Sequence, residues 1–173
     1  MSAPIPTATQ IADYYFRYFE NHAPCGDPQA ENQCAVRMSC ALEGSSPGFL
    51  NGFSPQNRVH RHRATCSDLP AHVLGAHELG HYLAQICGAQ DANSSSVSIS
   101  KMPRRYFIGR HGIIWFQQCY KTKQGTWSDH IDFWTGWHYM NETLEIGAGG
   151  SAGAEADLFD RSRGPVLLFE LNA

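Results

Sequence analysis

Residues 32–39 read Asn-Gln-Cys-Ala-Val-Arg-Met-Ser, and from Cys34 the apolar positions Met38 and Ala41 follow at i+4 and i+7. This spacing predicts a short helix that begins near Cys34 and ends near Gly44, with the cysteine on the face directed toward the core. A helix N-terminus favours the thiolate, which is the nucleophilic form of cysteine. The stretch therefore predicts a reactive cysteine where a loop enters a helix.

A candidate base for this thiol lies much later in the chain, where residues 128–134 read Ser-Asp-His-Ile-Asp-Phe-Trp. His130 could take the proton of Cys34 and return it to a leaving group. The structural alternatives are a small buried cysteine and one of nine histidines that happens to form a hydrogen bond.

The order of the expected elements places helices first and strands later. Apolar residues at helical spacing predict a helix over 9–21 capped by Thr9, and a further helix is expected from 67–70 to Gly88. Short β-branched or aromatic runs predict strands, at 106–108, 113–116, 130–134 and 166–171. This order predicts an α+β fold in which N-terminal helices pack on an antiparallel β-sheet.

Length and composition favour one domain spanning residues 1–173, because 173 residues with 42% hydrophobic residues can bury one substantial core. A net charge of −3 gives no general attraction to nucleic acid or to an anionic membrane surface. The N-terminus has no basic run followed by an apolar stretch, so we expect a soluble protein made in the cytoplasm without a secretory signal. Of the six cysteines, the five besides Cys34 leave room for one or two disulfides, whose pairing stays open.

A second motif indicates a different chemistry. His77-Glu78-Leu79-Gly80-His81 satisfies the H-E-x-x-H pattern of zinc peptidases. The two histidines could bind zinc while Glu78 activates a bound water, and a third ligand would be needed. The candidates for that ligand are Cys87, Glu142 and Glu145.

Helical periodicity argues against this zinc site. The apolar residues of the same helix centre opposite the two histidines, which predicts that His77 and His81 face solvent. The extended metzincin pattern also fails, because Ala84 stands where glycine is required and Cys87 where the third histidine is required. We therefore expect no metal and no cofactor.

Four segments together resemble the fourth family of type VI secretion amidase effectors. They are residues 32–39, the run Gly-Arg-His-Gly-Ile-Ile-Trp-Phe at 109–116, His-Ile-Asp-Phe-Trp at 130–134, and a closing strand at 165–171. The family has similar segments in the same order and at comparable spacing.

The resemblance implies a papain-like cysteine amidase that cuts peptidoglycan stem peptides between D-glutamate and meso-diaminopimelate. Cys34 would attack the amide, His130 would act as base and then acid, and N–H groups at the start of the cysteine helix would hold the oxyanion. The resemblance also implies secretion into the periplasm of a target cell and a cognate immunity protein as partner. The alternatives are the zinc metallopeptidase and a non-catalytic cell-wall-binding module.

The third member of the catalytic group is less clear from sequence. The family has an aspartate about eleven positions after the histidine, and Asn141 stands there in this chain. An asparagine oxygen can still orient the imidazole ring. The alternative is Asp132, which we rank second because two residues along a strand are about 6.6 Å apart. Asp129 is a further departure, since the family commonly has glycine before the histidine.

Overall fold

The computed structural model describes residues 3–20, 25, 33–53, 59–60, 71–87, 104–121, 124–140 and 158–172. Its α-helices are α1 (Ala8–Glu20), α2 (Cys34–Ser45), α3 (Ala76–Cys87) and α5 (Leu158–Arg161). Two short 3₁₀ segments are η1 (Phe49–Gly52) and η3 (Arg104–Tyr106). The strands are β1 (Val59–His60), β2 (His72–Val73), β3 (Gly112–Lys121), β4 (Trp127–Trp134) and β5 (Val166–Glu170).

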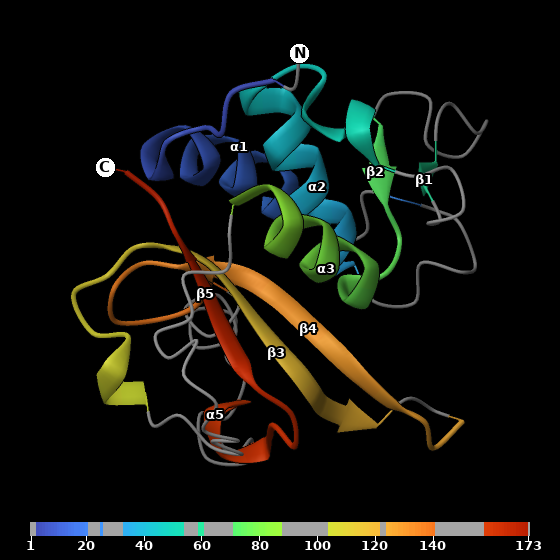
Figure 1. Cartoon of the computed structure of the whole chain (residues 1–173), viewed down its shortest axis with the longest axis vertical. Coiled ribbons are helices and arrows are strands. Elements are labelled where there is room, and N and C mark those ends of the chain that lie inside the picture. The colour runs from blue at the N-terminus through green and yellow to red at the C-terminus, as the bar shows by residue number, and fades with distance from the viewer. Residues whose placement is uncertain are drawn as a thin grey trace.

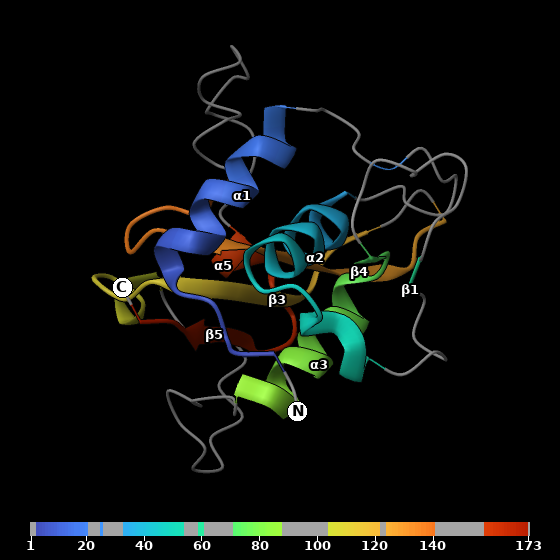
Figure 2. The same ribbon diagram turned by 90° about the horizontal axis from the view of Figure 1, so that it is seen from above.

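The main sheet has three antiparallel strands in the order β4-β3-β5, and β1 pairs with β2 in a separate antiparallel ladder. In the main sheet His130 on β4 lies opposite Phe116 on β3. Helices α1, α2 and α3 gather on one side of this sheet, and α5 lies on the other side (Figure 1). The view from above shows α1 and α2 lying over the sheet (Figure 2). The predicted α+β architecture with helices packed on an antiparallel sheet is confirmed.

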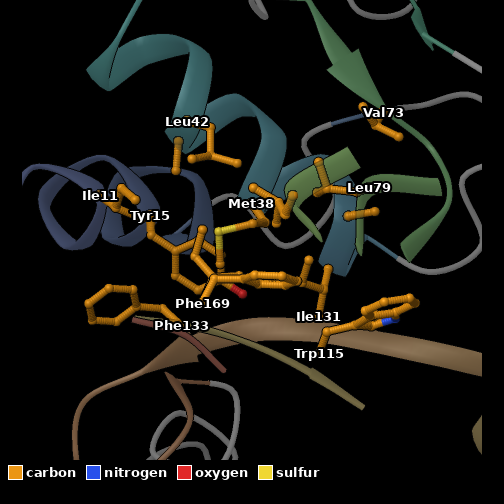
Figure 3. Packing of buried hydrophobic residues seen from close by; sticks show 14 of the residues in the cluster. Ile11, Tyr15, Met38, Leu42, Val73, Leu79, Trp115, Ile131, Phe133 and Phe169 are labelled. Carbon is orange, nitrogen blue, oxygen red and sulfur yellow. The ribbon is translucent and has the colours of Figure 1, made fainter. Parts of the chain in front are cut away.

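Both faces of β3 are buried, and alternate residues enter two different cores. Ile113 and Trp115 belong to the core that includes residues of α1, α2 and α3. Figure 3 shows Trp115 among the buried side chains of this core. Ile114 and Phe116 join the second core, which includes Phe159 of α5. Burial on both faces explains why residues 113–116 are continuously apolar.

Three sequence predictions need correction. Thr7 rather than Thr9 caps α1, because its Oγ1 accepts from the N–H of Gln10 at 3.3 Å while the Gln10 side chain accepts from the Thr7 N–H at 2.9 Å. Residues 106–108 form the end of η3 and a turn, not a strand. The N–H of Phe107 donates to the carbonyl of Arg104 at 3.0 Å, and the carbonyl of Phe107 accepts from the N–H of Arg110 at 3.2 Å, so the backbone bonds are local. The helix expected from residues 67–70 begins at Ala76, because β2 precedes it; residues 67–70 themselves lie outside the described part.

Gly80 lets α3 approach the sheet closely. A Cβ at this position would overlap the indole ring of Trp115. An ordinary Gly→Ala change inside a helix adds about 1 kcal/mol of stability, but overpacking a core costs about 1–3 kcal/mol. We expect Gly80→Ala to lower the free energy of unfolding, measured by urea denaturation.

The control for this substitution is Gln85→Gly, on the exposed side of the same helix. This variant measures how much a glycine in α3 lowers the free energy of unfolding through its poor helix propensity alone, about 1 kcal/mol. If Gly80→Ala instead stabilised the protein by that amount, the close contact with Trp115 would not be what makes a larger side chain unfavourable at position 80.

In the part of the chain that the structure describes, no helix is both long and apolar enough to cross a membrane. That residues 1–173 form a single domain stays a prediction.

Candidate active site

Cys34 is the first residue of α2, and its side chain is buried. Met38 and Ala41 are buried on the same face, so the predicted orientation of this helix is confirmed. The N–H of Arg37 donates to the carbonyl of Gln33 at 2.9 Å and closes the first helical turn. Helix geometry leaves the preceding N–H groups without an acceptor inside the helix, and the partial positive charge at this end favours an anion beside Cys34.

Gln33, just before the cysteine, ties the start of α2 to the backbone of Cys25, 8 positions earlier in the chain. Its side-chain oxygen accepts from the N–H of Cys25 at 3.2 Å, and its Nε2 donates to the carbonyl of Cys25 at 3.0 Å. This two-point contact fixes the backbone on the N-terminal side of the thiol. Sequence reasoning did not assign Gln33 a role, and its position next to Cys34 was the available signal.

His130 is buried on β4, and the carboxylate of Asp132 lies against its ring. Nε2 of the ring lies 3.4 Å from Oδ2 of Asp132. Since residues two apart on a strand share a face, the spacing that we ranked as unfavourable does bring the carboxylate to the ring. Asp132 is thus in contact with the candidate base.

The other oxygen of Asp132 is held by two donors. The hydroxyl of Tyr15 donates to Oδ1 at 2.7 Å, and so does the N–H of Phe133. Asp132 has no exposed surface, so these bonds fix the orientation of its carboxylate. The helical spacing of Tyr15 with Ile11 predicts only a core residue, and the sequence carries no signal for its polar contact.

The two side chains that contact Asp132, those of Tyr15 and His130, both have raised pKa values, but for different reasons. Burial raises the pKa of Tyr15 well above its usual value, and the negative charge of Asp132 raises it further, so the hydroxyl stays a neutral donor. For His130, burial lowers the pKa, but the charge of Cys34 and hydrogen bonds to Asp132 and Cys34 outweigh it and raise the pKa to about 10. The cause is the placement of the ring against the negative charges of Cys34 and Asp132, which favours the imidazolium.

We predict that the His130 ring stays protonated far above pH 6.5. In an imidazole NMR titration its midpoint should lie near pH 10, and it should fall in Cys34→Ala, because that variant lacks the largest of the raising contributions. A His130 midpoint below pH 7 in the wild type would contradict the electrostatic picture.

The same shift affects stability. Because the folded-state pKa is raised, the contribution of His130 to stability is complete below about pH 6.5, the unfolded value, and is lost as the pH rises through about 10.

Asn141, which we ranked first as the third member, lies outside the described residues, as do the candidate zinc ligands Glu142 and Glu145. Among the described residues, the structure therefore brings together three of the predicted site residues: Cys34, His130 and Asp132.

The histidines of the H-E-x-x-H motif lie on the exposed face of α3, as the helical periodicity predicted. The Glu78 carboxylate lies against Gly75 at the start of the helix. Cys87 is at the other end of α3, and burial raises the pKa of its thiol to about 11. Within the described ranges, no group of three or more His, Cys, Asp or Glu residues could hold a metal ion.

Solved structures share this fold. The type VI effector Tae4 from Enterobacter cloacae is 17% identical, with a TM-score of 0.64, over 99% of this chain and 100% of that one. Tae4 from Salmonella typhimurium, solved with the immunity protein Tai4 from Enterobacter cloacae, is 17% identical, with a TM-score of 0.59, over 96% and 99% of the two chains. This likeness supports the expected papain-like α+β fold. No curated protein matches the chain.

The family model that matches describes type VI secretion system amidase effector protein 4, and it covers residues 30–162. That range includes both Cys34 and His130. The chain therefore belongs to this family, Tae4, the type VI secretion amidase effectors with an antibacterial role against peptidoglycan.

Proposed function

We propose that the protein is a cysteine amidase that hydrolyses the γ-D-glutamyl to meso-diaminopimelate bond of peptidoglycan stem peptides, a DL-endopeptidase. The observation that carries the mechanism is the position of His130, buried between Cys34 and Asp132 and polarised by both. A thiol paired with an imidazole is the arrangement that activates a cysteine nucleophile. The choice of bond rests on the family resemblance.

In the first half of the reaction, His130 takes the proton of Cys34, and the resulting thiolate attacks the amide carbonyl carbon. The C–N bond breaks as His130 gives its proton to the leaving amine of diaminopimelate, which leaves the D-glutamyl γ-carbonyl as a thioester on the enzyme. N–H groups in the first turn of α2 stabilise the oxyanion, since they point out of the helix beside the sulfur.

In the second half, water attacks the thioester. His130, now neutral, takes a proton from this water, and the thioester C–S bond breaks to release the D-glutamate γ-carboxylic acid, which ionises in solvent, and to regenerate the Cys34–His130 pair. No metal takes part in either half.

Asp132 is the group that we propose orients His130. Its Oδ2 faces Nε2 of the ring, so we assign the other ring nitrogen, Nδ1, to the hydrogen bond with Cys34. Tyr15 and the N–H of Phe133 keep the carboxylate in place. Asn141 is the alternative from the family spacing.

The biological setting follows from family membership. We propose that the enzyme is delivered by a type VI secretion system and is active in the periplasm of the target cell. The related Tae4 of Enterobacter cloacae was solved in complex with Tai4, and by analogy a cognate immunity protein is the proposed partner of this chain.

The test is mass spectrometry of purified muropeptides after digestion by wild type, Cys34→Ala, His130→Ala and Glu78→Ala. We expect the wild type and Glu78→Ala to release peptides beginning with diaminopimelate and the first two variants to release none. Parallel digestion of monomeric and crosslinked muropeptides shows which stems are accepted.

Three results separate the alternatives. Cleavage by Cys34→Ala that a chelator stops would establish a zinc peptidase and reject the cysteine mechanism. Cleavage at another bond would reject the proposed specificity but keep the amidase. Binding of wild type to sacculi with no product at all would indicate the non-catalytic module.

A further inference from the structure

The exposed histidines of α3 form a pair that the hydrolytic mechanism does not use. His77 and His81 are one helical turn apart, with ring centroids 4.4 Å from each other and an interplanar angle of 76°. Both side chains are exposed, His77 by 63%. Two histidines at i and i+4 on a helix can direct ring nitrogens toward one ion, and imidazole suits zinc, copper and nickel.

A carboxylate fixes the tautomer of His77. Its Nδ1 lies 2.9 Å from Oδ2 of Asp129. A carboxylate only accepts hydrogen bonds, so Nδ1 must donate, and the lone pair of the neutral ring is then on Nε2. This is the arrangement by which carboxylates orient metal-binding imidazoles in proteins.

Asp129 is itself held rigidly, although it supports a surface residue. Its side chain is buried; Oδ2 accepts from Nε1 of Trp115 at 3.1 Å, and Oδ1 accepts from the N–H of Gln118 at 2.9 Å. Gln118 has a φ of 50° in the irregular part of β3, so its N–H is turned toward the carboxylate where the regular ladder is interrupted.

Trp115 also borders the pair. Its ring lies 6.0 Å from the His77 ring and 5.1 Å from the His81 ring, measured between centroids. An apolar wall on one side and an oriented Nε2 distinguish this pair from two unrelated surface histidines.

We propose that His77 and His81 bind one divalent transition-metal ion, of the class of Zn²⁺, with water completing its coordination, and that this ion takes no part in hydrolysis. The site is distinct from the Cys34–His130 pair. The Glu78 carboxylate, which would have to activate water in a zinc peptidase, lies against Gly75.

The test is calorimetric titration of the full-length protein, first freed of metal, with ZnCl₂ alone at pH 7.5. We expect one ion per chain for the wild type and no measurable binding for His81→Ala. Asp129→Asn should weaken binding by roughly 10–100-fold, the usual cost of losing such a supporting carboxylate. His111→Ala, which removes an exposed histidine outside the pair, is the matched control and should bind like the wild type.

His81→Ala decides the question, because His77→Ala would also remove a donor to buried Asp129 and could disturb the fold. Thermal melting of each variant without metal verifies folding. Equal zinc affinity in wild type and His81→Ala, or no binding by the wild type, would overturn the inference. Loss of hydrolysis when zinc is removed from the wild type would also overturn the inference, because the ion would then be catalytic.

Discussion

Cys34→Ala is expected to lower the rate of stem-peptide cleavage by about 10⁴-fold or more. The substitution removes the atom that attacks the amide, and the helix N-terminus and His130 cannot replace a covalent nucleophile. The measurement is the initial rate of muropeptide cleavage, followed by chromatography of the products.

The matched control is Cys40→Ala. Cys40 is on the same helix and is also fully buried, so this variant carries a similar packing cost and should keep most of the activity. Circular dichroism and thermal melting should show that both variants fold. If both lost activity equally, the effect of Cys34→Ala would be structural, and the assignment of Cys34 as nucleophile would lose its support.

Asp132→Asn is expected to lower kcat by roughly 10²–10⁴-fold through a change of tautomer. Tyr15 and the N–H of Phe133 both donate to Oδ1 of Asp132, so they would hold the asparagine oxygen at that position. The amide NH₂ would then face Nε2 of His130. Because NH₂ is a donor, Nε2 would have to accept, and the ring proton would move to Nδ1, the side of Cys34.

In that tautomer His130 cannot take the thiol proton, although the variant is nearly isosteric with the wild type. The measurement is kcat and its pH profile, with thermal melting to verify folding. Tyr15→Phe is the graded control: it removes one hydrogen bond to the charged carboxylate, worth about 1.5–3 kcal/mol, but keeps the tautomer of His130, so its kcat should fall less than that of Asp132→Asn.

Asn141→Ala provides the comparison between the two candidates for orienting the base. If Asp132 has this role, Asn141→Ala keeps most of its kcat. A large loss in Asn141→Ala together with near-normal activity in Asp132→Asn would reverse the assignment.

The helices and strands around the site could be predicted because they depend on the spacing of apolar residues within short stretches of the sequence. Met38 and Ala41 follow Cys34 at helical spacing, and all three are buried on α2. The strands β3, β4 and β5 correspond to runs of β-branched and aromatic residues. Residues 106–108 were misassigned because their apolar run reflects the burial of Phe107 in a turn, and burial alone does not distinguish a turn from a strand.

The sequence by itself determined the helix at Cys34, the strand at His130, the exposure of His77 and His81, and the family to which the four segments are similar. Each depends on residues near one another in the chain or on a motif. Only the tertiary structure decided that Asp132 contacts His130 and that Asp129 orients His77.

The physical reason is that these contacts depend on donors from distant segments. The Tyr15 hydroxyl that holds Asp132 lies 117 positions away in the chain, and Asp129 is held by Trp115 and Gln118 across a strand pair. Side-chain hydrogen bonds need atoms within about 3.5 Å, and packing of helix on sheet, rather than spacing in sequence, sets such distances.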